Sequence, residues 1–396
     1  MNNESMRILV LSEAFPFDAN SESFFIPEML RLRDGRSLAF APQVVSGDPY
    51  DGMSDVVFHP RNWRLSLPLF KSLGVVLKSA AKDLFSLKSN KGTKPSSAAW
   101  AVIKETAQVL RRLGKIDWSL IREWEPSQIY SLWGRTEGIC AIAIAECLKV
   151  KRVVIRHHNH DLYEERTPAN FLPGIRFYLS SPITFPVFLC QEAEQYAISR
   201  FGATQSSVAP LAIELQAKQL AGVASRTLRL VSISFESPVK RHGLLAEIIC
   251  ELDRRKISFS WTHIGESQLL GSLANNPIPP PKLDYKGSIA NTEVRAQLQR
   301  GEYHFLVSTS EFEGLPFSML EAVSAGIPSL GTNVGCVSSA LGAEAVLPVN
   351  STCNQWVDFI QSSVSRRDSI YGTQAKFVQG LSVTRTLPIL LNLLDG

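Results

Sequence analysis

Two glutamates with seven residues between them, Glu313 and Glu321, flank a predicted turn from a strand to a helix. The preceding run 303–308 is typical of a buried strand, and Pro316 suits the first turn of a helix over 317–325. A helix that begins directly after a strand offers free N–H groups and the positive end of its dipole to a phosphate or a sugar hydroxyl. The pair therefore predicts a ligand site. The alternative is that Glu313 caps the helix and Glu321 is solvated.

Two cations, Lys240 and Arg241, follow another predicted strand over 228–233. A lysine after a strand end suits a diphosphate because its ammonium group is a compact, mobile cation, and an arginine adds a fork of N–H donors. We therefore expect both side chains to bind phosphate oxygens. The alternative is a solvated pair of surface cations.

Three histidines and an aspartate lie close together in the sequence, at His157, His158, His160 and Asp161. Imidazoles and a carboxylate are good zinc ligands. Along an extended chain, however, alternate side chains point to opposite sides, so 158 and 160 share one side while 157 and 161 share the other. This spacing supports no better than a two-ligand site, and we predict no metal centre here.

All these residues follow predicted strands that alternate with helices, which is the pattern of parallel α/β sheets. Ligands of such sheets bind beyond the carboxyl ends of the strands. The predicted strands cover 7–11, 41–45, 128–132, 152–155, 187–190, 228–233, 260–264, 283–286, 303–308, 329–331 and 346–348. The sequence therefore predicts an α/β fold of two Rossmann-like parallel-sheet domains that face each other across a cleft.

The length of 396 residues fits two such domains. The stretch 216–225 is polar and rich in Ala, Gly and Ser, which predicts an interdomain linker. We therefore expect an N-terminal domain over 1–215 and a C-terminal domain over 226–380. A last helix over 381–396 is expected to pack back toward the N-terminal domain.

The composition is globular, with 45% hydrophobic and 20% charged residues. No apolar run approaches the ~20 residues of a membrane-spanning helix. The first apolar stretch is short and follows Glu4, which argues against a signal peptide. No two cysteines have the Cys-x-x-Cys spacing of a zinc knuckle. These features predict a cytoplasmic protein.

The net charge of +4 hides an uneven distribution, because the segment 61–115 has twelve Lys/Arg and only two acids, Asp83 and Glu105. Leucines, valines and aromatic residues lie among the cations at helical spacing. This pattern predicts a helical excursion that binds an anionic membrane surface at the inner face of the membrane. The alternative is a solvated excursion whose apolar face packs inward. No nucleic-acid motif accompanies the charge, so we predict no nucleic-acid partner.

Several catalytic motifs are absent from the sequence. No two aspartates have the D-x-D spacing of a metal-diphosphate site, and neither a G-x-x-x-x-G-K-[ST] loop nor a G-x-S-x-G elbow occurs. No G-x-G-x-x-G follows the first strand, which argues against dinucleotide redox chemistry. Helix N-termini and Lys/Arg can neutralise a diphosphate, so we expect no requirement for a divalent metal.

The run from Glu313 to Ala322, E-G-L-P-F-S-M-L-E-A, closely resembles the donor-binding region of family-4 glycosyltransferases of the GT-B fold. The hallmark of that family is a Glu-x7-Glu pair. Gly326-Ile327-Pro328 and Thr332-Asn333-Val334-Gly335 extend the resemblance. Asn333-Val334-Gly335-Cys336 departs from the usual Asp-Val-Gly-Gly of the family.

Other segments are similar to the same family. The segment 231–241 resembles its strand-then-Lys phosphate loop, and the turns at Gly265 and Gly287 resemble those that hold the nucleotide base through main-chain groups. Phe15-Pro16 with 21–26, and 156–166 with its R-x-H…D-L-Y-E-E-R pattern, resemble a branch that builds bacterial polysaccharides of the colanic-acid or exopolysaccharide type. The resemblance therefore spans nearly the whole chain.

This resemblance implies a retaining glycosyltransferase of cell-surface polysaccharide biosynthesis, with a UDP- or GDP-sugar donor, a saccharide or lipid-linked acceptor and no further cofactor. The N-terminal domain would bind the acceptor, with His158 placing its hydroxyl and Asp161 orienting His158. The C-terminal domain would bind the donor through Lys240, Arg241, Gly265, Gly287, Glu313, Gly314, Leu315, Pro316, Phe317, Ser318 and Glu321. Glu313 would hold the donor sugar and Glu321 the ribose. The alternatives are a nucleotide-sugar epimerase of the same fold and a catalytically silent GT-B binding subunit.

Overall fold

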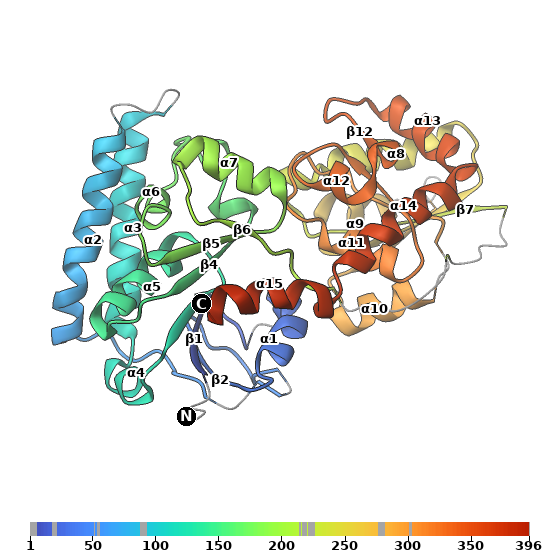
Figure 1. Cartoon of the computed structure of the whole chain (residues 1–396). Coiled ribbons are helices and arrows are strands. Elements are labelled where there is room, and N and C mark those ends of the chain that lie inside the picture. Colours follow the sequence, from blue (N-terminus) through green and yellow to red (C-terminus); the bar gives the residue numbers. More distant parts are fainter. Residues whose placement is uncertain are drawn as a thin grey trace. The chain divides into compact units, whose positions relative to one another are not determined.

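The computed structural model describes residues 6–17, 22–50, 52–53, 56–87, 93–213, 215, 220, 226–275, 282–300 and 303–395. Contacts between residues divide the chain into two compact units (Figure 1). Unit 1 is Met1–Ala212 with Thr386–Gly396, and unit 2 is Ile213–Arg385. Ser21 and most of the predicted linker over 216–225 lie outside the described residues.

Unit 1 contains a six-stranded parallel sheet with the strand order β2-β1-β3-β4-β5-β6. The strands are β1 (Met6–Ser12), β2 (Arg36–Pro42), β3 (Gln128–Ser131), β4 (Val153–His157), β5 (Thr184–Phe188) and β6 (Ser207–Val208). Three predicted strands are confirmed, whereas those predicted at 41–45 and 187–190 were placed too late in the chain and overlap β2 and β5 only at their last two residues. The apolar core of β2 is Leu38 to Ala41, and the polar Arg36 and Ser37 hide its start in the sequence.

Helices cover this sheet, and β1, β3 and β4 are almost fully buried because a parallel sheet is packed on both faces. The helices of unit 1 are η1 (Ser23–Phe25), α1 (Ile26–Leu32), α2 (Leu67–Ser86), α3 (Pro95–Lys115), α4 (Trp118–Trp124), α5 (Arg135–Leu148), η2 (Asn159–Asp161), η3 (Glu164–Arg166), α6 (Ile175–Tyr178) and α7 (Gln191–Phe201). The basic segment forms α2 and α3, which pack together as a long antiparallel hairpin (Figure 1).

The C-terminal helix α15 (Val383–Asp395) belongs to unit 1 from Thr386 onward. The carboxylate of Asp395 accepts hydrogen bonds from the Arg36 guanidinium at 2.8 and 2.6 Å. Arg152 donates to the carbonyl oxygen of Leu393 at 2.8 Å. These contacts fix the last turn of α15 to Arg36, the first residue of β2, and to Arg152, which directly precedes β4. Among the described helices, none combines the length and the hydropathy needed to cross a membrane.

Unit 2 contains a second six-stranded parallel sheet, with the order β12-β11-β10-β7-β8-β9. Its strands are β7 (Leu228–Ile233), β8 (Phe259–Ile264), β9 (Leu283–Gly287), β10 (Phe305–Val307), β11 (Ser329–Thr332) and β12 (Val346–Leu347). All six predicted strands are confirmed. The order is that of a Rossmann sheet, in which the direction of strand addition reverses between β7 and β10.

The helices of unit 2 are η4 (Pro238–Lys240), α8 (His242–Arg254), α9 (Gln268–Ala274), α10 (Asn291–Gln299), α11 (Phe317–Ser324), α12 (Val337–Leu341), η5 (Ala343–Ala345), α13 (Cys353–Val364) and α14 (Arg367–Gly380). Helix α8 follows β7, and α11 follows β10. Both helices therefore begin at the carboxyl ends of the strands, at the point between β7 and β10 where the strand order reverses.

Candidate functional site

Two loops of unit 2 meet at the point where the strand order reverses. One follows β7 and the other follows β10, and these two strands are parallel neighbours with Leu230 opposite Phe305. The backbone N–H of Glu311 in the second loop donates to the carbonyl oxygen of Val239 in the first, at 2.8 Å. In open α/β sheets, this crevice at the carboxyl ends of the strands is where ligands bind.

The same two loops bring together the cation and the carboxylate that the sequence singled out. The Lys240 ammonium lies 2.6 Å from Glu313 Oε1, and the two side chains are 21% and 16% exposed. Because the pair is only partly buried, a ligand can reach both groups. A phosphate can replace Glu313 as the partner of the Lys240 ammonium group. The Glu313 carboxylate can then accept hydrogen bonds from hydroxyl groups.

Glu313 does not cap the following helix. Helix α11 begins at Phe317, and its capping residue is Pro316, whose side chain accepts no hydrogen bond from the first turn. Leu315 is buried beneath this turn. The structure therefore excludes the capping alternative. The positive, N-terminal end of α11 follows directly on the Glu313 loop, and the N–H groups of Phe317 and Met319 donate to the carbonyl oxygens of Leu315 and Pro316 at 3.0 Å.

Glu321 lies on α11, 3.7 Å from the guanidinium of Arg295 on α10. Its side chain is only 26% exposed. Burial raises the pKa of the Glu321 carboxyl above its usual value, and Arg295 opposes this effect. Glu321 is therefore not the solvated helix residue of the alternative interpretation.

The guanidinium of Arg241 is occupied within the protein, which differs from the prediction that it binds a diphosphate. It donates to the carbonyl oxygens of Thr309 and Val349 at 2.5 Å each, and to Thr332 Oγ1 at 3.3 Å. The Thr309 hydroxyl in turn donates to the carbonyl oxygen of Lys240 at 3.1 Å. Arg241 therefore holds the loops after β7 and β10 to the ends of β11 and β12, and it positions the backbone that carries Lys240.

Replacing Arg241 by alanine is expected to lower the free energy of unfolding by about 1–3 kcal/mol, because three acceptors lose their donor. Urea or thermal unfolding measures this effect. Arg254→Ala is the matched control, since Arg254 pairs only with the neighbouring Glu251 at the surface, and it should leave the midpoint unchanged. If Arg241→Ala unfolds like the wild type but no longer binds nucleotide, Arg241 contacts the ligand instead.

Gly265 and Gly287 lie at the ends of β8 and β9, as predicted. Gly265 has φ +122°, and a Cβ there would lie 2.0 Å from the carbonyl oxygen of Ser234 in the loop after β7. Its N–H donates to the carbonyl oxygen of Gly287 at 2.8 Å. The absence of a side chain at Gly265 thus lets the loops after three neighbouring strands approach one another.

The loop after β11 supports Glu313 directly through a residue whose role the sequence reasoning missed. Gly335 has φ +52°, and a Cβ there would lie 1.8 Å from the carbonyl oxygen of Glu313. The available signal was the match of 332–335 to a family motif, but the motif does not reveal that this glycine touches the Glu313 backbone.

In unit 1 the strand order reverses between β1 and β3, and a buried glutamate organises the loops there. Glu22 is 2% exposed. Its carboxylate accepts hydrogen bonds from the backbone N–H of Ala14 at 2.7 Å, from the N–H of Phe15 and from the Trp133 indole. Glu22 lies in the segment 21–26 that resembles a family motif, but the motif does not predict that Glu22 joins the two loops.

His158 follows β4 and packs among aromatic rings. Its ring lies 4.2 Å from that of Trp133, and Phe24 and Phe25 complete the surroundings at 5.8 and 5.6 Å. Burial lowers the pKa of His158 well below its usual value, so the imidazole is neutral. Nε2 lies 3.2 Å from the carbonyl oxygen of Leu132, which can only accept a hydrogen bond. Nε2 therefore carries the proton, and Nδ1 is an acceptor.

Contrary to the prediction, the Asp161 carboxylate does not bind the imidazole, which Asp161 contacts only through its backbone N–H. Its two carboxylate oxygens accept hydrogen bonds from the backbone N–H groups of His158 and Gly134, both at 2.6 Å. Burial raises the pKa of Asp161 to about 7. Asp161 therefore joins the turn after β4 to the loop after β3, and it positions the backbone that carries His158.

The neighbouring histidines face different surroundings. His157 stacks against Tyr178 and Phe188, with ring centroids 5.5 and 5.1 Å away, whereas His160 lies 4.9 Å from Trp133. Burial lowers the pKa of His157 to about 3 and that of His160 to about 4. The imidazoles of His157 and His158 thus lie in separate aromatic clusters, as the alternation along the strand predicted.

Comparison with known proteins rests on solved structures, because no protein-family profile and no curated protein sequence matches the chain. Among the similar structures is HepE from Anabaena in complex with UDP and glucose, at 14% identity and a TM-score of 0.64, covering 98% of this chain and 99% of HepE. The lipopolysaccharide outer core galactosyltransferase WaaB has 11% identity and a TM-score of 0.65, with coverage of 98% and 99%.

Sucrose-phosphate synthase from Thermosynechococcus elongatus is also similar, at 11% identity and a TM-score of 0.68, with 98% of each chain covered. The likeness to these proteins extends over nearly the full length of each, and its low sequence identity makes it a likeness of fold. The chain therefore has the GT-B fold of these glycosyltransferases.

Proposed function

We propose that this protein is a glycosyltransferase that moves a sugar from a nucleotide-sugar donor to a saccharide acceptor. The observation that carries the proposal is the Lys240–Glu313 pair, which lies at the reversal of strand order in unit 2. A cation for phosphate and a carboxylate for hydroxyls are the two groups that a nucleotide-sugar needs side by side. The likeness to HepE, which was solved with UDP and glucose, supports this choice of ligand.

The donor chemistry is electrostatic. When the bond between the anomeric carbon and the diphosphate breaks, negative charge develops on the leaving phosphate oxygens. Lys240 and the positive end of the α11 dipole would stabilise that charge, and such preorganised electrostatic groups usually make a large contribution to catalysis. Glu313 would hold hydroxyls of the donor sugar, and Glu321 those of the ribose.

The acceptor chemistry belongs to His158 in unit 1. The neutral imidazole has Nδ1 free of a proton, so it would accept a hydrogen bond from the attacking hydroxyl or from a sugar hydroxyl in place of the backbone N–H of Asp161, which reaches the ring in the turn after β4. Asp161 would act on this step only through the backbone that it fixes. The Lys240, Glu313 and His158 assignments use no divalent metal.

The finer parts of the proposal rest on the motifs of the sequence. The segments 15–26 and 156–166 resemble the branch of family-4 enzymes that builds bacterial polysaccharides. We therefore propose retention of the anomeric configuration, a UDP- or GDP-sugar donor, a saccharide or lipid-linked acceptor, and a role in making cell-surface polysaccharide. The protein would work in the cytoplasm, peripherally at the inner face of the membrane.

Incubation with UDP- and GDP-sugars, with and without saccharide acceptors, tests the function when the products are followed by NMR. We expect release of nucleoside diphosphate and a new glycoside that keeps the donor's anomeric configuration, and both should require the acceptor. An epimerised sugar from donor alone would identify the epimerase alternative. Nucleotide binding without any product would identify the silent subunit, and an inverted product would refute retention but not transfer.

A further inference from the structure

The α2–α3 hairpin of unit 1 exposes apolar side chains that a protein surface usually hides. One face of α2 packs against α3, α5 and α6 and buries Leu69, Val75 and Val76. The opposite face is also apolar, and it consists of Leu67, Phe70, Leu77 and Leu84, with Phe85 beside it. Leu67 is 69% exposed and Phe85 is 82% exposed. Spacings of three and seven residues align the first four in one stripe along the helix.

Helix α3 adds two more exposed apolar side chains, those of Trp100 and Ile103. Because α2 and α3 pack side by side, both helices present large apolar groups to the outside over much of the hairpin. Contiguous exposed apolar surface of this kind marks a site of interaction with another molecule or with a membrane.

The charges of the hairpin surface have one sign. Lys71, Lys78 and Lys104 are exposed beside the apolar stripe. The two acids of the segment 61–115 are buried: Asp83 accepts a hydrogen bond from the Gly174 N–H at 2.6 Å, and Glu105 pairs with Arg135 at 2.9 Å. Within the described part of this segment, therefore, no carboxylate faces solvent. An apolar stripe flanked by lysines is typical of a helix that lies in the interface of an anionic bilayer.

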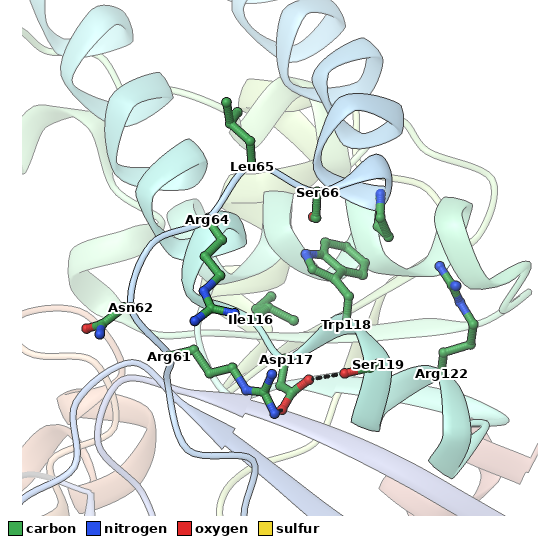
Figure 2. Close-up of a pocket in the computed structure, with 12 residues that line it drawn as sticks. Arg61, Asn62, Arg64, Leu65, Ser66, Ile116, Asp117, Trp118, Ser119 and Arg122 are labelled. Carbon is green, nitrogen blue, oxygen red and sulfur yellow. Dashed lines mark hydrogen bonds and ion pairs between the residues drawn. The ribbon is translucent and has the colours of Figure 1, made fainter.

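A pocket opens at the base of the hairpin, between the segment before α2 and the start of α4. Its cavity volume is about 290 Å³. The lining includes Arg61, Arg64, Leu65, Trp118 and Arg122 (Figure 2). Leu65 belongs both to the pocket and to the exposed apolar surface, so the pocket adjoins the stripe that begins at Leu67.

Two of the three arginines in the pocket are available to a ligand. Arg61 is paired with Asp117. By contrast, the side chains of Arg64 and Arg122 form no hydrogen bond or ion pair with any residue in the part of the chain that the structure describes, and in Figure 2 the Trp118 side chain lies between them. An unpaired guanidinium at the rim of a cavity suits a phosphate, because it can donate two parallel hydrogen bonds to it.

The pocket is built by the fold. The N–H groups of Arg61 and Arg64 donate to the carbonyl oxygens of Lys115 and Gly114 at 2.8 and 3.0 Å, which fixes the segment to the end of α3. Trp63 packs so closely on Gly114 that a Cβ at this glycine would lie 2.0 Å from its indole nitrogen. Trp118 is nearly buried, and its Nε1 donates to the carbonyl oxygen of Leu113 at 3.0 Å.

We propose that this surface docks the protein on an anionic bilayer. Leu65, Leu67 and Phe70 would enter the boundary between headgroups and acyl chains, and Arg64 and Arg122 would hold the phosphate of an anionic phospholipid in the pocket. Symmetric pairing of two copies through the same face would set lysines against lysines, so charge favours the bilayer over a second copy. This inference does not depend on the donor chemistry proposed above.

Co-sedimentation with vesicles tests the docking. We expect the wild type to pellet with vesicles of equal parts phosphatidylcholine and phosphatidylglycerol, to remain in the supernatant with phosphatidylcholine alone, and to be released by high salt. The double variant Lys71→Gln, Lys78→Gln should bind the anionic vesicles about 30-fold more weakly, because each lysine near the surface contributes about 1 kcal/mol. Its transfer rate on a soluble acceptor should stay unchanged. The matched control, Lys151→Gln with Lys376→Gln, loses the same charge at exposed positions elsewhere and should bind nearly as the wild type.

A separate pair of variants tests whether the pocket binds a headgroup phosphate. The variant Arg64→Gln with Arg122→Gln should bind anionic vesicles at least tenfold more weakly than the Lys151/Lys376 control, although both lose two charges. Equal binding by these two variants would refute the headgroup site. If the wild type stays in the supernatant with anionic vesicles at low salt, the docking proposal fails. A dimer that forms with rising concentration and is broken by Phe70→Ser would then identify the face as a self-association interface.

Discussion

Replacing Lys240 by alanine is expected to lower kcat/KM for sugar transfer by about 100-fold or more. The ammonium group lies 2.6 Å from Glu313, at the point where the loops after β7 and β10 meet. Removing a preorganised donor from the place where charge develops in a transition state typically costs a factor of about 10²–10³. Steady-state kinetics with the preferred nucleotide-sugar measures the effect.

Lys282→Ala is the matched control for this variant. Lys282 also belongs to unit 2 and lies within 4.0 Å of an aspartate, Asp253, but it precedes β9 and so lies at the opposite edge of the sheet. Its kcat/KM should equal that of the wild type. A Lys240→Ala enzyme that keeps the wild-type kcat/KM would exclude Lys240 from the donor site.

Substitution of Gly335 by alanine should abolish most of the activity without removing any proposed ligand contact. A Cβ at this position would lie 1.8 Å from the Glu313 carbonyl oxygen, and the φ of +52° is itself strained for a residue with a side chain. The Glu313 loop must therefore move. We expect kcat/KM to fall about 100-fold, as displacements of about 1 Å at a catalytic site can do, and the free energy of unfolding to fall by about 1–3 kcal/mol.

The control for this substitution is Gly372→Ala in helix α14. A Cβ there meets nothing within 4 Å and the φ is ordinary, so alanine should raise the free energy of unfolding by about 0.5–1 kcal/mol and leave the kinetics unchanged. Normal transfer by Gly335→Ala would show that the Glu313 loop can shift without harm. That result would argue against a fixed position of Glu313 in catalysis.

The sheets could largely be predicted from the sequence because their strands are buried on both faces and therefore appear as continuous apolar runs. The inner strands of unit 2 were found in this way, whereas β9 and β12 at the two sides of that sheet are only partly buried. In unit 1 the first two residues of β2, Arg36 and Ser37, are polar, and β6 has only two residues, Ser207 and Val208. Neither strand therefore gives a clear apolar run. Because Lys240 and Glu313 each follow a predicted strand, both were expected at the carboxyl ends of the strands of one sheet. The structure confirms that they lie together there.

The hydrogen bonds that position the site could not be predicted, because they join residues distant in the sequence. Arg241 looked like a phosphate ligand next to Lys240, but its partners Thr309 and Val349 lie 68 and 108 residues away. Asp161 appeared to be a partner for the His158 imidazole, but it accepts from backbone N–H groups. The direction of the side chain determines the hydrogen-bond partners of both residues. A sequence motif specifies residue type and spacing but not this direction.

Isothermal titration of the wild type with UDP and with GDP tests the central claim most directly, since the claim is that unit 2 binds the diphosphate of a nucleotide-sugar. We predict that at least one of the two nucleotides binds with one site per chain. The Lys282→Ala variant should give the same titration, and Lys240→Ala should bind at least tenfold more weakly. If neither UDP nor GDP binds the wild type, the proposed donor site does not exist.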